Sequence, residues 1–343
     1  MSTVAERPVQ PVRRAARPRR VLRADAALMI VLALALFLAP LYLQNDYQVR
    51  ILVLICIFGA ASTGWNLLGG FANQISLGHA VFFGVGAYAV VILQSRLGLS
   101  PWVAMPVGVL VSLLAALLIG WPTFRLSGHY FALGTLALLQ IFDIVARYWK
   151  DLTGGPAGVT LPILPSSLLN LQFDRTGPYL YVAGGLLIVA LASAWLVRYS
   201  RLGLRLDCIR LNPQAASLAG VNLFRTKLAA LLISAVIVSL AGSMYAAFQG
   251  FLDPNTAFSF NTSINMALFA IIGGVSFWWG PVLGALILVP LGQVASSQLT
   301  GNLAALGPLS YGLLLIVLVI LQPRGIAGWL NALWQRLVVR GKS

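Results

Sequence analysis

Two side chains that could do ionic chemistry stand inside an otherwise apolar stretch of the chain. Asp143 and Arg147 are four residues apart, the spacing that places two side chains on one face of a helix. An ionisable group is costly in an apolar medium, so such a pair lines a wet path, contacts a partner, or anchors the end of a helix. The pattern leaves the lining of a path and the local anchor both open.

A second polar stretch, NLLGGFANQISLGH at 66–79, interrupts two apolar runs. Glycine permits a broken helix and close approach of backbones, as expected where a substrate crosses a membrane or where helices pack tightly. The glycines continue with a spacing too close for GxxxG packing alone. Tight packing remains the alternative to a path. The candidates in this stretch are Asn66, Asn73, Gln74, Ser76, Gly78, His79, Gly84 and Gly86.

Another glycine cluster, GGVSFWWGPVLGA at 273–285, predicts a sharp reversal between two apolar segments. Glycine and proline together favour such a turn, and close packing of the flanking helices is the simplest reason for them. The residues assigned to this turn are Gly273, Gly274, Gly280, Pro281 and Gly284.

The segment 198–227 carries six basic side chains and one acid between two long apolar stretches. A basic segment of this length in an apolar protein must lie in water. Within it, Asn212 precedes Pro213, which is typical of an N-cap followed by proline at the first helical position. Gly220 can end a helix without a Cβ clash. The sequence therefore predicts a short helix over 212–220.

The usual motifs of catalysis are missing from the sequence. The match to GxxxxGK[ST] at 341–343 has Arg336 at the first glycine position, so no ATP site is predicted. No GxSxG precedes a helix, and the two histidines have no obvious carboxylate partner. Cys56 and Cys208 have no metal-binding spacing. We expect neither a catalytic residue, a metal nor a bound cofactor, which disfavours a membrane enzyme.

The elements that carry these residues must be membrane helices. The chain is 59% hydrophobic and 9% charged, with a mean hydropathy of +0.88, whereas soluble domains have roughly 25% charged residues. The sequence predicts an all-α polytopic protein of about ten spans, with eight spans as the alternative. The ten predicted spans are 26–43, 51–68, 80–94, 102–121, 130–147, 179–197, 228–248, 263–279, 283–298 and 309–322.

The distribution of basic residues supports an even number of spans. With ten spans, 18 of the 23 lysines and arginines fall on the side that holds both termini, and this side is the cytoplasm by the positive-inside rule. Because the arginines flank apolar segments, they indicate orientation and not nucleic-acid binding. The predicted organisation is a disordered basic arm at 1–25, a transmembrane domain at 26–322 and a basic tail at 323–343. The loop 148–178 lies outside and the loop 198–227 inside.

Three stretches together resemble the signatures of bacterial ABC-importer permeases for branched-chain amino acids, and among them the LivM-like subunit. They are WNLLGGFANQISLGHAVFFGVGAYA (65–89), LTGGPAGV (152–159) and GGVSFWWGPVLGA (273–285). The resemblance covers about residues 50 to 330. It implies an inner-membrane location, a LivH-like permease partner, two ATPase subunits that hold the ATP, a periplasmic binding protein and a small amino-acid substrate. The loop residues Thr153, Gly154, Gly155 and Gly158 would then face the binding protein.

The same resemblance gives the helix at 212–220 a role. ABC-importer permeases often carry an E-A-A-x3-G element where the ATPase docks, and here Gln214, Ala215, Ala216 and Gly220 match it. Glutamine replaces the acid, which puts a charge-dependent contact in doubt. Gln140 likewise stands where relatives often have glutamate, and it joins the candidate path. A plain linker helix, a urea or short-amide permease, and an ion-coupled carrier remain alternatives.

Overall fold

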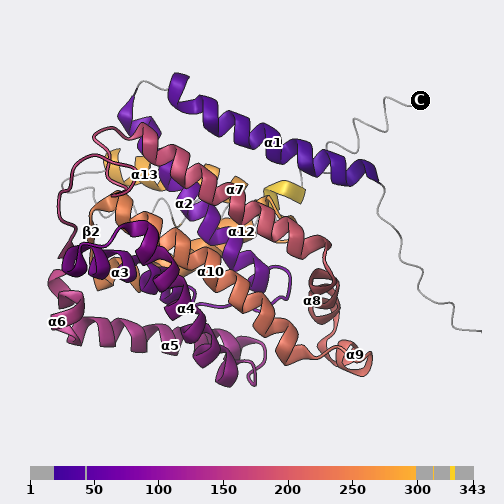
Figure 1. Cartoon of the computed structure of the whole chain (residues 1–343). Helices are drawn as coiled ribbons and strands as arrows, with labels where there is room; N and C mark the ends of the chain where they lie inside the picture. The colour runs from indigo at the N-terminus through magenta and orange to yellow at the C-terminus, as the bar shows by residue number, and fades with distance from the viewer. Residues whose placement is uncertain (1–18, 43–44, 299–311, 313–324, 329–343) are drawn as a thin grey trace, which may run out of the picture.

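The computed structural model describes residues 19–42, 45–298, 312 and 325–328, and these form a bundle of helices (Figure 1). Two short strands, β1 (Val159–Thr160) and β2 (Phe251–Leu252), pair antiparallel, and η1 (Gly155–Ala157) is a 3-10 turn. The helices are α1 (Arg19–Tyr42), α2 (Asp46–Gly69), α3 (Ala80–Leu97), α4 (Pro101–Thr123), α5 (His129–Tyr148), α6 (Lys150–Thr153), α7 (Gly177–Tyr199), α8 (Arg201–Leu211), α9 (Pro213–Leu218), α10 (Leu223–Gln249), α11 (Pro254–Ala257), α12 (Phe260–Gly273) and α13 (Gly280–Gln298).

Seven stretches of the described chain are long and apolar enough to cross a membrane, so this is an all-α polytopic membrane protein. Six predicted spans fall inside six of these helices, namely α2, α3, α4, α5, α7 and α10. The shorter apolar helices within α1 and α13 match two further predictions. Of the predicted span 309–322, only residue 312 is described.

Two predicted boundaries are wrong. The span expected at 263–279 stops at Gly273, because Gly274 takes a φ of +119° that ends the helix. The arm expected to be disordered through residue 25 already enters α1 at Arg19. The stretch RRVLRAD at 19–25 follows the last proline of the arm, and its residues are compatible with a helix.

The core forms where α10 packs against α2 and α3. Glycines allow the backbones to touch there, since a Cβ on Gly242 would lie 1.9 Å from the carbonyl oxygen of Phe83. Likewise, a Cβ on Gly86 would lie 2.0 Å from the carbonyl oxygen of Ser239. In Figure 1, α1 and α5 lie along opposite sides of this core, α8 and α9 lie at one end, and β2 and α6 lie at the other.

Candidate functional site

The glycine-rich stretch after α2 folds back onto the bundle as an irregular segment. The indole nitrogen of Trp65 donates to the carbonyl oxygen of Ser76 at 2.8 Å, and the Leu77 amide donates to Thr135 Oγ1 of α5 at 3.0 Å. A Cβ on Gly78 would lie 2.6 Å from the Thr135 carbonyl oxygen. The break predicted from the sequence is therefore real, and close packing against α5 explains Gly78.

The polar residues of this stretch separate into buried and exposed groups. Asn66, Ser76 and His79 are buried, whereas Asn73 is exposed and Gln74 half-buried. His79 Nε2 lies 3.0 Å from Ser234 Oγ of α10, so this ring ties α3 to the core. Most of the candidate path residues in the stretch therefore make contacts within the chain, and Asn73 presents the open polar surface.

The next two glycines of this run also serve packing. A Cβ on Gly84 would lie 2.4 Å from the ring of Phe258, and Gly86 adjoins α10. The sequence left a substrate path and tight helix packing open for these glycines, and the geometry supports tight packing.

The reversal between α12 and α13 contacts the end of α2. Asn66 Nδ2 donates to the carbonyl oxygen of Phe277 at 3.4 Å, and a Cβ on Gly70 would lie 2.8 Å from the carbonyl oxygen of Val275. Within the turn, Gly273, Gly280 and Gly284 make the backbone approaches expected of a packed reversal. Helix α13 begins at Gly280, and Pro281 is its second residue. Both glycine clusters are evident in the sequence, and the structure shows that they contact each other.

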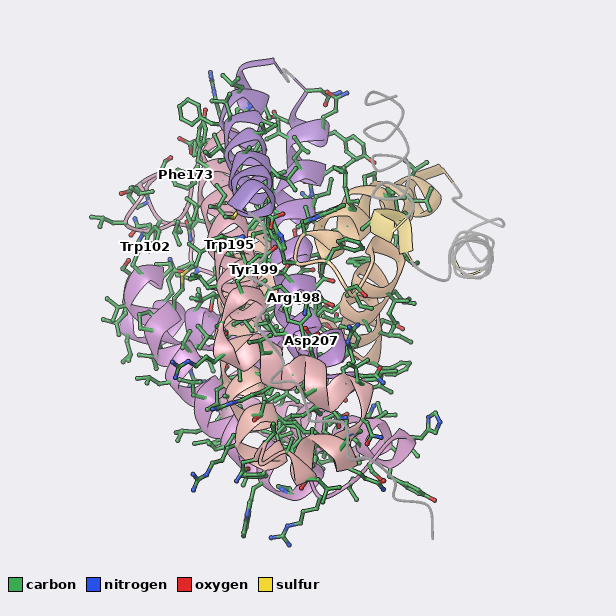
Figure 2. All side chains as sticks on the ribbon, turned by 90° about the vertical axis from the view of Figure 1, so that its right-hand side faces the viewer. Trp102, Phe173, Trp195, Arg198, Tyr199 and Asp207 are labelled. Carbon is green, nitrogen blue, oxygen red and sulfur yellow. The ribbon has the colours of Figure 1, made fainter. Side chains whose placement is uncertain are left out.

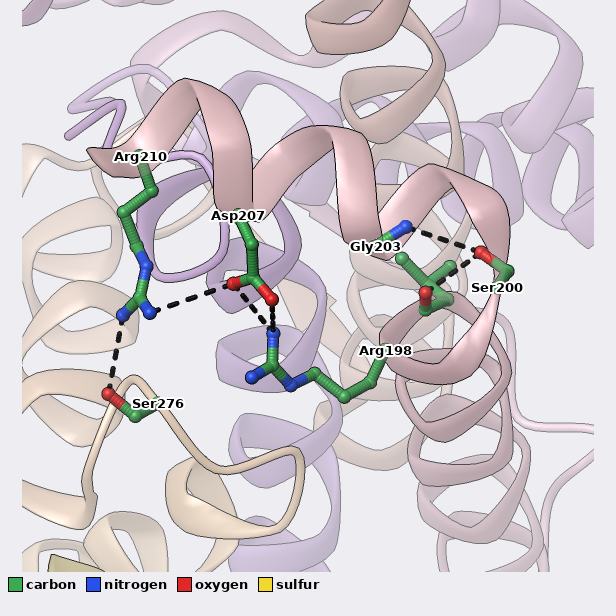
Figure 3. Close-up of polar contacts among 7 residues, drawn as sticks. Arg198, Ser200, Gly203, Asp207, Arg210 and Ser276 are labelled. Carbon is green, nitrogen blue, oxygen red and sulfur yellow. Dashed lines mark hydrogen bonds and ion pairs between the residues drawn. The ribbon is translucent and has the colours of Figure 1, made fainter. Parts of the chain in front are cut away.

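An ion-pair cluster links α8 to these two clusters (Figure 3). Arg198 Nη1 donates to both carboxylate oxygens of Asp207 at 2.7 Å, and Arg210 Nη2 lies 3.6 Å from Asp207 Oδ1. The Arg198 guanidinium also lies over the ring of Phe71, 5.4 Å from its centroid. Arg210 Nη1 donates to Ser276 Oγ at 3.5 Å. We name Arg198 of α7 together with Asp207 and Arg210 of α8 the α8 clamp.

Sequence reasoning missed the α8 clamp, although a signal was present. Asp207 is the one acid in the basic segment 198–227, and Arg210 follows at the i,i+3 spacing. Figure 2 shows Arg198 and Asp207 beside each other, farther along the bundle from Trp102 and Phe173.

The predicted short helix is confirmed as α9. Asn212 Oδ1 accepts from the amides of Gln214 at 2.9 Å and of Ala215 at 3.0 Å. Pro213 occupies the first position, and Gly220 takes a φ of +79° just beyond the end. Ala216 is buried, while Gln214 is exposed. All residues of α9 except Ala216 are exposed, and Figure 1 shows the helix at the end of the bundle.

The predicted pair on α5 also forms. Arg147 Nε donates to Asp143 Oδ2 at 2.7 Å, and Arg147 Nη2 donates to Asn255 Oδ1 of α11 at 2.7 Å. Gln140, about one turn earlier, is exposed. The pair thus anchors the end of α5 to α11. Of the seven candidate spans, α5 has the smallest buried share, 22% of its most apolar 18-residue stretch.

The loop after α5 is held by its glycines. Thr153 is buried and its Oγ1 donates to the carbonyl oxygen of Ala146 at 2.5 Å. Gly154, Gly155 and Gly158 all have positive φ, and a Cβ on Gly158 would lie 2.6 Å from the carbonyl oxygen of Leu252. These residues turn the chain into the β1–β2 pair. The outward-facing part of the loop lies beyond them, where Ile163 is 98% exposed.

A family model for the permease component of branched-chain amino acid transport systems matches residues 47–321. The chain belongs to this family.

Curated relatives agree with that membership. The high-affinity branched-chain amino acid transport system permease protein LivM of Escherichia coli (strain K12) is 29% identical over 87% of this chain and 74% of its own length. The corresponding permease protein LivH of Salmonella typhimurium is 24% identical over 79% of this chain and 91% of its own. The nucleoside ABC transporter permease protein NupC of Lactococcus lactis is 25% identical over 66% and 74%.

The membership assigns a transport role to the chain, as a permease component. Among the described residues, no three His, Cys, Asp or Glu side chains gather as a metal site would need. Asn66, Ser76, His79, Asp143 and Arg147 each contact another side chain or the backbone. They hold helices together and leave α9 and one face of α5 uncovered.

Proposed function

We propose that this permease is the LivM-like subunit of a binding-protein-dependent ABC importer for leucine, isoleucine and valine. It pairs with a LivH-like permease in the bacterial inner membrane and works by alternating access, driven by two separate ATPase subunits. Ten spans with both termini in the cytoplasm fit the charge pattern of the sequence. Family membership and the likeness to LivM support this assignment.

The observation that carries the coupling part of the proposal is α9. It is a capped helix outside the long spans, and its Leu218 is 91% exposed. Leu211, at the end of α8, is 81% exposed as well, so two leucines at the junction of α8 and α9 offer apolar surface to a partner. Ala216 anchors the opposite face, so the helix is held firmly while its outer face is free to contact an ATPase.

The α8 clamp supports a route from α9 into the bundle. Helix α8 ends at Leu211, directly before the cap of α9, and the α8 clamp ties it to Phe71 and Ser276. A push on α9 would therefore reach the ends of α2 and α12 together. Rigid elements joined by ion pairs are a suitable physical connection for such a movement.

Leu218→Asp tests the docking surface. In proteoliposomes holding the permease pair, the ATPases and the binding protein, we expect ATP-driven leucine uptake and co-purification of the ATPases to fall by about tenfold or more, the loss of an interface anchor. Ile163→Asp is the matched control, because Ile163 is equally exposed at the opposite end and should leave ATPase retention unchanged. Normal retention in Leu218→Asp would exclude α9 as the docking helix.

The energy source and the substrate need their own measurement. Uptake that requires ATP hydrolysis supports the importer, whereas uptake driven by an ion gradient without ATPases would support the ion-coupled carrier. Binding of leucine, urea and a nucleoside to the cognate binding protein then separates the amino-acid reading from its alternatives. We expect leucine to bind and the other two not to.

A further inference from the structure

A basic hollow opens between α8, the turn after α9 and the start of α10. Its volume is about 420 Å³. The lining residues come from three elements: Leu202 and Arg205 of α8, Ala219, Gly220, Val221 and Asn222 of the turn, and Arg225, Thr226 and Ala229 of α10. The lining is thus partly apolar, and it includes two exposed arginines from different helices. We name it the α8–α10 hollow.

The two arginines of the α8–α10 hollow have no carboxylate partner among the residues that the structure describes. The nearest acid in sequence, Asp207, is already bound by Arg198 and Arg210. The hollow also lies at the N-terminal end of α10, a helix of 27 residues, where the helix dipole adds positive potential. The site therefore has positive charge from three sources, and no carboxylate of the described ranges pairs with its arginines.

The neighbouring residues indicate at which level of the membrane the α8–α10 hollow lies. Helix α10 is about 40 Å long at 1.5 Å per residue, about 10 Å more than a hydrocarbon core needs. Next to Arg225, the Phe224 ring packs edge-on against Phe124, with centroids 6.2 Å apart. Arg125 lies 5.3 Å over the ring of Trp121, which is 65% exposed. Exposed tryptophan beside arginine marks the headgroup level of a membrane, so Arg225 lies near that level.

We propose that the α8–α10 hollow binds the phosphate of an anionic phospholipid in the leaflet on this side. Arg205 and Arg225 would donate to the phosphate oxygens, the geometry for which guanidinium is best suited. The volume of the hollow, about 420 Å³, leaves room for the glycerol. Leu202 and Ala229 offer the apolar contact that a lipid uses and a free phosphate does not.

The test is lipid retention by the purified full chain, measured by native mass spectrometry with phosphatidylglycerol and with phosphatidylcholine. Wild type should retain one phosphatidylglycerol in preference to phosphatidylcholine. Arg205→Gln and Arg225→Gln should each weaken retention about tenfold, the loss of one charged hydrogen bond. Arg201→Gln is the matched control, because Arg201 is exposed on α8 but does not line the hollow. It should behave as wild type.

Two further measurements distinguish a bound lipid from other ligands of the α8–α10 hollow. If millimolar inorganic phosphate displaces the lipid, the hollow is a free-anion site and the lipid proposal fails. If the chain assembled with its ATPases retains no lipid, and Arg225→Gln weakens that assembly, an acidic protein side chain is the occupant and the proposal fails too. Equal loss of both lipids in all three variants would indicate nonspecific surface charge. Unchanged thermal unfolding of each variant shows that the fold is intact.

Discussion

Helices α2 and α5 are both apolar spans, but they are buried very differently. In the most apolar 18-residue stretch of each, 83% of the residues are buried in α2 and 22% in α5. Their mean hydropathies, 2.0 and 1.5, differ far less. Hydropathy therefore indicates that a helix crosses the membrane, while burial within the protein depends on which neighbours it packs against.

The polar side chains of α2 and α5 differ in burial in the same way. Ser62 of α2 is buried and donates to the carbonyl oxygen of Met266 at 2.7 Å, so its hydroxyl is satisfied within the chain. Gln140 of α5 is exposed. An amide facing lipid is unfavourable, so the outer face of α5 needs water or another protein. This supports α5 as the side that meets the permease partner and the substrate path.

The largest expected effect comes from a substitution in the buried core, where α10 packs against α3. Gly242→Ala should lower the free energy of unfolding by about 3 kcal/mol, because the new Cβ would meet the Phe83 carbonyl oxygen and force the backbones of α3 and α10 apart. The change in the free energy of unfolding is measured by unfolding the purified chain with sodium dodecyl sulfate in mixed micelles.

The matched substitution on α5 is Gly134→Ala. Its new Cβ would meet the end of the flexible Leu126 side chain, so we expect a change within about 1 kcal/mol. Similar losses in the two variants would mean that α5 is as constrained as the core.

The sequence predicts local features well and contacts between distant segments poorly. Cap and turn chemistry identify α9 through Asn212, Pro213 and Gly220, and spacing identifies the Asp143–Arg147 pair. Neither kind of signal could place Arg198 over Phe71, because that contact depends on how separate helices pack. Glycine clusters predict a close approach, but they do not say whether the neighbour is another helix or a substrate.

A smaller effect is expected from the polar link inside the core. Ser234→Ala removes the hydroxyl beside His79 Nε2 and leaves a buried ring nitrogen without its hydrogen bond. The expected loss is about 1–3 kcal/mol of unfolding free energy, measured by the same micellar unfolding. Ser193→Ala on α7 is the control, since Ser193 Oγ bonds only to the Val189 carbonyl of its own helix. If the core variant is no less stable than the control, His79 has another partner and belongs among the path residues.

The smallest expected effect lies on α5 and tests whether its outer face has a function. Gln140→Leu should leave micellar stability unchanged, because Gln140 makes no hydrogen bond among the described residues and is exposed. Leucine uptake by the reconstituted importer should fall about threefold, near 0.7 kcal/mol of barrier, because a polar contact with the path or partner is lost. Leu114→Gln on α4 is the reverse control: Leu114 is exposed there, and the new amide should lower the yield of folded protein but not uptake per folded molecule. Wild-type uptake in Gln140→Leu would mean that Gln140 contacts neither the path nor the partner, and the difference between α2 and α5 would then concern packing alone.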